Sequence, residues 1–237
     1  MKYFFFTMLA ACLAIASQAQ KVINDPNVEV RSVGSFTKLD ISNAFDVVIT
    51  QSNQESVAVS SNIEGDNQNI ITIVENGKLR IGYKNRDRKW YKNHNLKAYI
   101  SVKTLESFEG SGASKITIEG SLAAQNLEIK LSGATDMKGA LAVREKLSLD
   151  LSGASDVTFT GAAGSIDIDA SGASDIKAFE LMAGDCNIDA SGACSIRISV
   201  EKEMSADLSG ASTVQYKGNA MIRNIKTSGA SNISRKS

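Results

Sequence analysis

The stretch from residue 147 to residue 176 reads LSLDLSGASDVTFTGAAGSIDIDASGASDI. It holds two copies of one pentapeptide, Ser152-Gly153-Ala154-Ser155-Asp156 and Ser171-Gly172-Ala173-Ser174-Asp175. The Ser-Gly-Ala part of this pentapeptide occurs seven times in the chain of 237 residues. The seven glycines are Gly112, Gly133, Gly153, Gly172, Gly192, Gly210 and Gly229. A spacing of 18 to 21 residues between them indicates a repeat protein.

Apolar residues occupy fixed positions relative to the repeated glycine. Four residues before it stand Ile129, Leu149, Ile168, Ile188, Ala206 and Ile225. Four residues after it stand Ile116, Met137, Val157, Ile176, Ile196, Val214 and Ile233. The positions between these columns and the glycine alternate between polar and small or apolar residues, which predicts strands on both sides of a Ser-Gly-Ala corner.

Strands that recur in register every ~20 residues describe a coil whose turns stack ~4.8 Å apart. We therefore predict an all-β fold, a parallel β-helix over residues 111–237, and right-handed by the general preference of parallel crossovers. Small residues suit the corner because identical side chains stack on one another there, and glycine permits unusual backbone angles.

Residues 36–110 predict a less regular β region that includes the first rungs. A degenerate copy of the corner, Ser42-Asn43-Ala44-Phe45-Asp46, places the first unit near residue 36. Strand-like runs follow at residues 36–41, 46–51, 57–60, 70–75, 79–83 and 98–102. Asn76-Gly77 between two of these runs predicts a hairpin. Residues 20–35 form an N-terminal segment before this region.

The N-terminus predicts an exported protein. Lys2, an apolar run over residues 3–16 and the small residues of Ser17-Gln18-Ala19 follow the order of a secretory signal peptide, residues 1–19. A second interpretation is a lipoprotein box at Leu9-Ala10-Ala11-Cys12, with Cys12 lipidated. No later stretch approaches the ~18 apolar residues that a transmembrane helix needs.

Cys186 and Cys194 are the cysteines beyond the leader. They stand eight residues apart with an extended segment between them, so their Cα atoms are expected beyond the ~7 Å limit for a disulfide. Cys186 aligns with the inward residues Leu127, Leu147 and Ile166, which predicts a free and buried thiol.

The charge balance excludes several kinds of function. Lys and Arg number 26, Asp and Glu number 26, and the chain has one histidine. A formal net charge of zero gives no attraction to nucleic acid or to an acidic membrane surface. One histidine also excludes a histidine-rich metal site, and the cysteine and histidine spacing offers no zinc site, so no cofactor is predicted.

An outward column of aspartates lies three residues before the glycine: Asp150, Asp169, Asp189 and Asp207. Oxygen ligands suit a divalent cation such as calcium, and this ladder is the candidate metal site. The alternative is a solvated acidic face that keeps the sheet soluble, because carboxylates ~4.8 Å apart repel by only about 1 kcal/mol in water.

Residues 84–95 concentrate positive and aromatic side chains. They include Arg88, Lys89, Trp90, Tyr91 and His94, and hold the only tryptophan and the only histidine. Aromatic rings beside cations can stack on a sugar or on an acidic ligand, so these five residues are the candidate ligand-binding set. The alternative is a loop whose tryptophan packs back on the solenoid.

Catalytic motifs are not found. A serine nucleophile needs a base within reach, and the single histidine lies outside the Ser-Gly-Ala repeats. Paired carboxylates exist in the aspartate ladders, but an acid and a base need distinct environments, whereas the ladder positions look equivalent. We therefore expect a protein that is not an enzyme.

The tandem Ser-Gly-Ala-Ser-Asp turns, the copy that begins at Ser42-Asn43-Ala44 and the export signal together resemble the secreted, mostly Bacteroidetes family of autotransporter-adhesin head GIN domains. The resemblance covers roughly residues 36–219. It implies a β-helix similar in shape to pectin lyases without their catalytic residues, and adhesion at the cell surface. No translocator segment is recognised, so we expect a protein that is not a complete autotransporter.

The function predicted from sequence is cell-surface adhesion or ligand binding, with a glycan or a cell-surface protein as partner. One alternative is a structural envelope protein without a specific ligand. The other is a carbohydrate-active enzyme of the pectin-lyase type. The expected location is the periplasm, the outer-membrane surface or the extracellular space, and the sequence leaves the oligomeric state open.

Overall fold

The computed structural model describes residues 25–84 and 94–236, which are nearly all in strands. One short 3-10 helix, η1 (Asp66–Asn69), interrupts them. Within the described residues no helix has the length and apolar character to cross a membrane. The strands are β1 (Glu29–Arg31), β2 (Lys38–Ile41), β3 (Phe45–Gln51), β4 (Ser56–Ser61), β5 (Ile70–Glu75), β6 (Lys78–Tyr83), β7 (Leu96–Val102), β8 (Ser107–Gly110), β9 (Lys115–Leu131), β10 (Asp136–Leu151), β11 (Asp156–Ala170), β12 (Asp175–Ala190), β13 (Ser195–Leu208), β14 (Thr213–Lys217), β15 (Met221–Thr227) and β16 (Asn232–Arg235).

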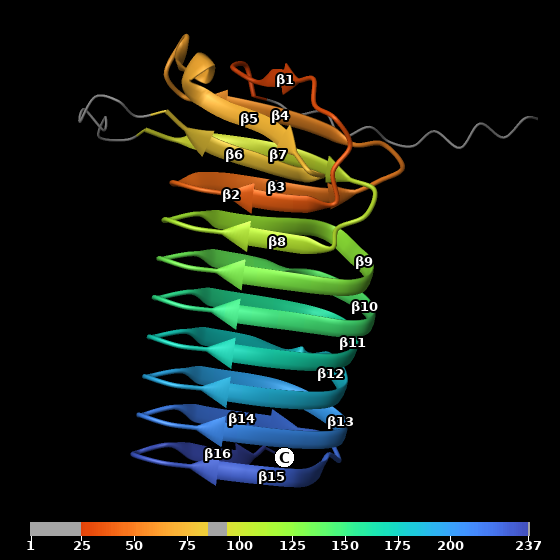
Figure 1. The fold of residues 1–237 in the computed structure, drawn as a ribbon, viewed down its shortest axis with the longest axis vertical. Coiled ribbons are helices and arrows are strands. Elements are labelled where there is room, and N and C mark those ends of the chain that lie inside the picture. The colour runs from red at the N-terminus through yellow and green to blue at the C-terminus, as the bar shows by residue number, and fades with distance from the viewer. Residues whose placement is uncertain (1–24, 85–93, 237) are drawn as a thin grey trace, which may run out of the picture.

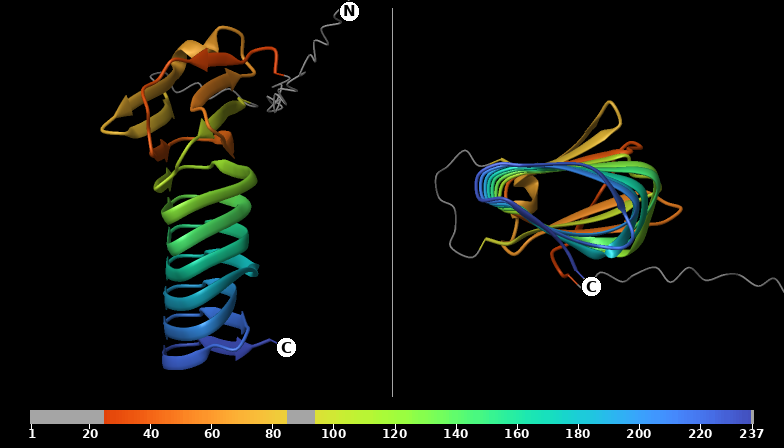
Figure 2. Two further views of the ribbon diagram at one scale, coloured as in Figure 1. Left: turned by 90° about the vertical axis from the view of Figure 1, so that its right-hand side faces the viewer. Right: turned by 90° about the horizontal axis from the view of Figure 1, so that it is seen from below.

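The repeats form a parallel β-helix, as predicted. Strands β9 to β13 each run from one Ser-Gly-Ala corner to the next, and each pairs in parallel with the strands of the rungs before and after it. Figure 1 shows these rungs stacked along the long axis with their corners in one line. Seen along that axis in Figure 2, two long sides converge at the corners and a short side closes the opposite end.

The interior is built from aliphatic columns that the glycine alignment identified. Ile116, Met137, Val157, Ile176 and Ile196 lie beside one another in successive rungs and are all buried. A fully buried Ile or Leu contributes ~1.5–3 kcal/mol of burial free energy. Each rung covers the apolar side chains of its neighbour from one side only. A single rung therefore cannot bury its core, and stability requires several stacked rungs.

Each corner glycine from Gly133 onward lies directly against the glycine of the rung before it. Gly172 has a φ of +74°, and a Cβ added there would lie 2.4 Å from the carbonyl oxygen of Gly153. The same contact recurs at Gly133, Gly153, Gly192, Gly210 and Gly229 at 2.4 to 2.5 Å. Both the positive φ and the missing side chain are therefore required at this position.

Hydrogen bonds connect the corners along the stack. The backbone N–H of Ala173 donates to the carbonyl of Gly153 at 2.8 Å, and equivalent bonds of 2.7 to 2.9 Å join the other corners. The fourth corner residue points inward, where the Ser155 hydroxyl donates to its own rung's Ser152 carbonyl at 2.9 Å. Cys194 takes this place in its rung, with its Sγ 3.2 Å from the Ser191 carbonyl oxygen.

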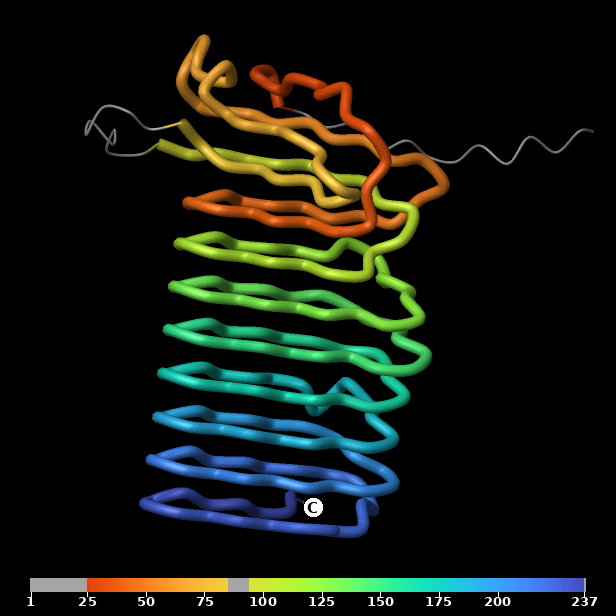
Figure 3. The backbone as a smooth tube through the Cα atoms, in the orientation of Figure 1, coloured from red at the N-terminus to blue at the C-terminus, as the bar shows by residue number. Residues whose placement is uncertain are grey.

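Differences in repeat length are absorbed at the short side, away from the corners. The register between β12 and β13 shifts between Ala178 and Met182 and again between Ala183 and Asp185. The tube in Figure 3 bulges at this part of β12. The alignment near the corners is thereby kept, although the spacing between glycines varies from 18 to 21 residues.

The N-terminal region begins the stack but not in chain order. The corner between β2 and β3 lies against the corner between β8 and β9, because β2 pairs with β8 and β3 with β9. On the other side of β2 and β3 lie β6 and β7, also in parallel. Strands β6 and β7 therefore lie beyond β2 and β3 in the stack. The predicted hairpin is confirmed, since β5 and β6 pair antiparallel around Asn76-Gly77.

Asn43 shows why the first corner tolerates a side chain. It has a φ of +75°, as the corner glycines do. Its side-chain oxygen accepts a hydrogen bond of 2.9 Å from the backbone N–H of Tyr83. In later rungs the corresponding space is filled by the preceding glycine, so Asn fits at the first corner only.

Both described cysteines are free and buried, as predicted. Cys186 lies beside Ile166 in an inward column. Burial, with a smaller contribution from the Asp167 charge, raises the pKa of Cys186 to about 12. The thiol is therefore protonated at neutral pH and packs as an apolar side chain.

Candidate functional site

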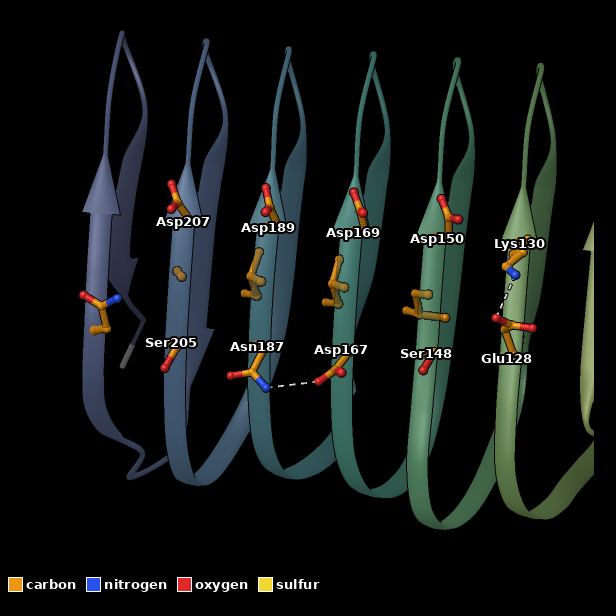
Figure 4. A pocket seen from close by; sticks show the side chains of 15 residues that line it. Glu128, Lys130, Ser148, Asp150, Asp167, Asp169, Asn187, Asp189, Ser205 and Asp207 are labelled. Atoms are coloured by element: carbon orange, nitrogen blue, oxygen red, sulfur yellow. Dashed lines mark hydrogen bonds and ion pairs between the residues drawn. The ribbon is translucent and has the colours of Figure 1, made fainter.

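One long side of the solenoid carries a shallow hollow of about 570 Å³. It is formed by the half of each rung that precedes the corner, from β9 to β13 and β15. Two outward columns line it, and we call this surface the ladder face. The first column is Asp150, Asp169, Asp189 and Asp207; the second is Ser148, Asp167, Asn187 and Ser205. Figure 4 shows both columns pointing outward from the same strands.

The four ladder aspartates lie in adjacent rungs in direct register. Lys130 precedes them in the column and Lys226 follows them. Lys226 reaches Asp207 with an N–O distance of 3.8 Å. Within the described residues Asp150, Asp169 and Asp189 make no ion pair, so the middle of the face holds three exposed carboxyl groups that no cation contacts.

The carboxylates of the ladder face do not have equivalent environments. Partial burial and the charges of Asp150 and Asp189 raise the pKa of Asp169 above its ordinary value. Burial works in the same direction on Asp167, but hydrogen bonds from Lys146 and Asn187 outweigh it and lower the pKa. The two carboxylates differ because, within the described residues, only Asp167 has a cation and an amide as partners.

The second column is held by contacts between rungs. The Asn187 side-chain N–H donates to the Asp167 carboxylate at 3.1 Å, and Lys146 forms an ion pair with the same carboxylate. Ser148 and Ser205 add hydroxyl groups to the surface in neighbouring rungs. The column thus offers hydroxyl, amide and carboxylate groups in one row.

No group of three or more acidic, histidine or cysteine side chains in the described part of the chain is arranged to hold a metal ion. The ladder carboxylates stand in a row along the stack and do not converge on one point (Figure 4). Calcium binding at Asp150, Asp169, Asp189 and Asp207 stays a prediction.

The opposite long side is close to neutral. It carries a second acidic column, in which Asp175 follows Asp136 and Asp156. Lys177 and Arg197 lie 3.1 and 3.5 Å from the Asp175 carboxylate. Basic side chains beside this second column therefore offset its charge, unlike on the ladder face.

His94 lies at the N-terminal end in a buried cluster around Asp66. The Asp66 carboxylate accepts hydrogen bonds from the Ser61 and Tyr83 hydroxyls at 2.9 and 2.7 Å and from the Asn69 amide at 2.9 Å. His94 Nε2 lies 2.7 Å from the same carboxylate. The cluster connects the end of β4, the 3-10 helix η1, the end of β6 and the residues just before β7.

This cluster has a structural role. The side chain of His94 is almost fully buried, so the prediction that it contacts a ligand at the surface is corrected. Ser61 and Asp66 both contact the same nitrogen of His94, and Ser61 is buried. A nucleophile and an orienting acid need opposite nitrogens of the ring, so the three residues are not a catalytic triad.

The other members of the predicted ligand-binding set, Arg88, Lys89, Trp90 and Tyr91, lie outside the described residues, as do the leader and Cys12. The described chain reaches Lys84, just after β6, and continues from His94, just before β7.

The geometry of the ladder face suits an extended polar ligand. Groups in one column repeat every ~4.8 Å along the stack, and the two columns stand two residues apart on each strand, ~6.6 Å. A hydroxyl-rich polymer can donate hydrogen bonds to carboxylate, amide and hydroxyl oxygens at several rungs at once. In the sequence, this second column can be recognised as the polar residue five positions before each repeated corner glycine.

Comparison with known proteins gives a family and a fold. A family model described as "Putative auto-transporter adhesin, head GIN domain" matches residues 35–220. No curated protein matches the sequence.

Three solved structures share the fold. A "putative adhesin" from Bacteroides fragilis superposes with a TM-score of 0.80 at 20% identity, over 90% of this chain and 98% of that chain. A "putative adhesin" from Parabacteroides merdae has a TM-score of 0.66 at 16% identity, over 89% and 96%. A "Putative lipid binding protein" from Parabacteroides distasonis has a TM-score of 0.59 at 17% identity, over 89% and 98%.

Proposed function

The chain belongs to the family of auto-transporter adhesin head GIN domains, and on this basis we propose that it is an exported adhesive module whose ladder face binds a cell-surface glycan. The observation that carries the proposal is the hollow over β9 to β13 and β15, which is lined by two columns of outward polar groups. The protein binds through this surface without catalysis.

A glycan fits the ladder face better than a compact ligand does. The hollow is long and open, and its polar groups repeat at every rung. A polymer with a repeating unit can match several rungs at once, and weak contacts at each rung add to a useful affinity. Hydroxyl donors suit Asp150 and Asp189, which make no ion pair within the described residues.

Export is supported by the predicted leader. Residues 1–19 follow the pattern of a signal peptide. The cleaved protein is placed in the periplasm, at the outer-membrane surface or outside the cell; lipidation of Cys12 is the alternative form. Mass spectrometry of the protein purified from its host distinguishes a free N-terminus near Gln20 from a lipidated Cys12.

A glycan array tests the proposed function. We expect binding by the wild-type chain and its loss in the double variant Asp169→Ala, Asn187→Ala. The control is Asp156→Ala, Thr158→Ala, because these two residues are also exposed but lie on the opposite long side. Equal binding by both variants contradicts a role of the ladder face, and no binding by the wild-type chain contradicts the glycan proposal.

The basic aromatic segment stays a second candidate surface, tested on the same array. The variant Trp90→Ala, Tyr91→Ala keeps its affinity if the ladder face binds the glycan. If this variant alone loses binding, the ligand lies at residues 84–95 instead.

Calcium binding by the ladder is tested by thermal melts with and without a chelator. A structural cation raises the melting temperature according to its concentration relative to its dissociation constant. A midpoint that the chelator leaves unchanged, in the wild-type chain and in Asp169→Asn alike, contradicts the calcium site.

A carbohydrate-active enzyme is the second candidate function. The specific observation in its favour is the opposite direction of the pKa shifts of Asp167 and Asp169 on one strand, since unequal carboxylates are what acid–base hydrolysis uses. Incubation with acidic polysaccharides decides the point. If the wild-type chain releases oligosaccharides and Asp169→Asn does not, the protein is an enzyme. If no product forms, the enzyme function is rejected.

A further inference from the structure

The C-terminal end of the solenoid presents an open sheet edge. Within the described residues β15 pairs only with β13, and β16 only with β14. In every earlier rung the corner glycine carbonyl accepts an N–H from the next rung; in the described part of the chain the carbonyl of Gly229 has no such partner. Figure 1 shows the rung of β15 and β16 at the end of the stack.

The inward side chains of this last rung are exposed. Ile222 and Ile225 continue the columns of the buried residues Met204 and Ala206. They are 36% and 39% exposed, and Met221 beside them is 60% exposed. In the described part of the chain, the last rung therefore presents an apolar row bordered by backbone groups without a strand partner, a combination that favours pairing with another chain.

Basic side chains surround the edge but are turned toward the rung above. After Asp207 the chain has no acidic residue, whereas it has Lys217, Arg223, Lys226, Arg235 and Lys236. Arg223 forms an ion pair with Glu203, and Lys226 reaches Asp207. Lys217 lies over the ring of Phe179 at 4.8 Å. Arg235 donates to the Gly218 carbonyl and to the Asn219 side-chain oxygen at 2.6 and 3.1 Å, so Arg223 and Lys226 are the two of these residues that pair with carboxylates in the described part of the chain.

The N-terminal end does not match this edge. It is built from β1, which is three residues long, and from the antiparallel hairpin β5–β6. Figure 2 shows the hairpin diverging from the outline of the rungs below it. End-to-end stacking of unlike ends therefore lacks a second edge of equal length and direction, whereas two C-terminal ends are identical by definition.

We propose that the C-terminal end of the solenoid is the contact surface of a two-fold dimer, in which β15 pairs antiparallel with β15 of a second copy. A two-fold axis across the edge brings identical strands together in opposite directions, and the contact closes without forming a filament. The proposal does not depend on the glycan proposed above.

The sequence of β15 fits this pairing. A seven-residue strand is ~23 Å long. When Ile225 lies opposite Ile225 of the second copy, Lys226 lies opposite Asn224 of the second copy, so two lysines are never opposed. The inward isoleucines of the two copies then cover each other, and the aliphatic interior becomes continuous through the dimer.

Sedimentation velocity of the full chain over a concentration series tests the proposal. We expect a dimer that dissociates on dilution, and a monomer for Ile225→Asp at every concentration. The matched control is Val30→Asp, because Val30 is 75% exposed on the edge strand β1 at the other end; this variant should dimerise as the wild-type chain does. Circular dichroism melts show whether each variant is folded.

Cross-linking gives an independent readout if Ile225→Asp does not fold. Residues opposite each other on antiparallel strands have Cβ atoms ~4.5–5.5 Å apart, close enough for a disulfide after a small shift. Ile225→Cys should form a disulfide-linked dimer on mild oxidation, and Met182→Cys, exposed on the solenoid wall, should not. A wild-type monomer at all concentrations, or a dimer lost in Val30→Asp and kept in Ile225→Asp, overturns the proposal.

Discussion

Replacement of Gly172 with alanine tests the close contact on which every rung depends. The residue has a φ of +74°, and a Cβ would lie 2.4 Å from the Gly153 carbonyl oxygen. Left-handed backbone costs an alanine ~1–2 kcal/mol. Moving the Cβ from 2.4 Å to at least 3.0 Å separates the two rungs by about 0.6 Å. This shift lengthens the bond from the Ala173 N–H to the same carbonyl.

The two costs can be separated by controls within the chain. Overpacking of this size adds ~1–3 kcal/mol, so we expect Gly172→Ala to lose about 3 kcal/mol of unfolding free energy. Gly120→Ala has the same positive φ of +75° with nothing within 4 Å, and should lose only the ~1–2 kcal/mol of the backbone term. Gly34 has neither feature, so Gly34→Ala should be close to neutral.

Urea denaturation followed by circular dichroism measures all three variants. The midpoint and the slope should be fitted together, because a solenoid can unfold in parts and the slope then falls. If Gly172→Ala is no less stable than Gly120→Ala, the stacking of glycine on glycine contributes nothing and the reasoning about the corner is refuted.

The remaining predictions concern the core, two carboxylates and a thiol. Leu181→Ala removes a fully buried side chain and should cost ~2–5 kcal/mol, whereas Met182→Ala at the exposed neighbour should change urea stability by less than ~0.5 kcal/mol. Burial of the Asp66 carboxyl is outweighed by four side-chain hydrogen bonds, which hold its pKa below 3.8. The ionised carboxylate therefore stabilises the folded state above pH 3.8, and this contribution is lost as the pH falls through the lower folded pKa. Asp66→Asn should flatten this acid dependence of the melting temperature. The pKa of Asp169 is raised, so the charge of its carboxylate opposes folding at neutral pH. Asp169→Asn should therefore raise the melting temperature at pH 7, and the difference in melting temperature from the wild-type chain should shrink as the pH falls toward 4. Cys186 should resist iodoacetamide in the native protein and react in urea, which peptide mass spectrometry detects.

The repeat made most of the fold predictable from sequence. A glycine at a fixed period, with a mostly aliphatic residue four positions to either side, determines the corner, the direction of each side chain and the parallel register together. Cys186 was placed correctly in the interior for this reason. A helical or sandwich fold does not produce like residues in register every ~20 positions.

The order of the N-terminal rungs could not be predicted in the same way. Strands β6 and β7 lie beyond β2 and β3, and the pairing of β2 with both β6 and β8 depends on contacts distant in sequence. The cluster around Asp66 has the same origin, since its members come from four elements without a repeated spacing. His94 was therefore expected at the surface although its ring is buried against a carboxylate.

The unequal carboxylates of the ladder face were also beyond the sequence pattern. Asp167 and Asp169 occupy outward positions two residues apart on one strand. Lys146 of the preceding rung and Asn187 of the following one distinguish them, and both contact only Asp167. A column describes which residues stack, whereas the pKa of each depends on side chains that reach across columns.

Pulsed electron–electron distance measurement tests the central claim, the parallel stack, most directly. One spin label replaces Asp207, and the second replaces Asp40, Glu109 or Lys130 in turn, with excess unlabelled chain present to dilute contacts between copies. These residues belong to one outward column, six, five and four rungs from Asp207. The account predicts distances of about 29, 24 and 19 Å, in equal steps of ~4.8 Å. Distances that do not change in equal steps, or a label at Asp40 that lies no farther from Asp207 than one at Glu109, would contradict it.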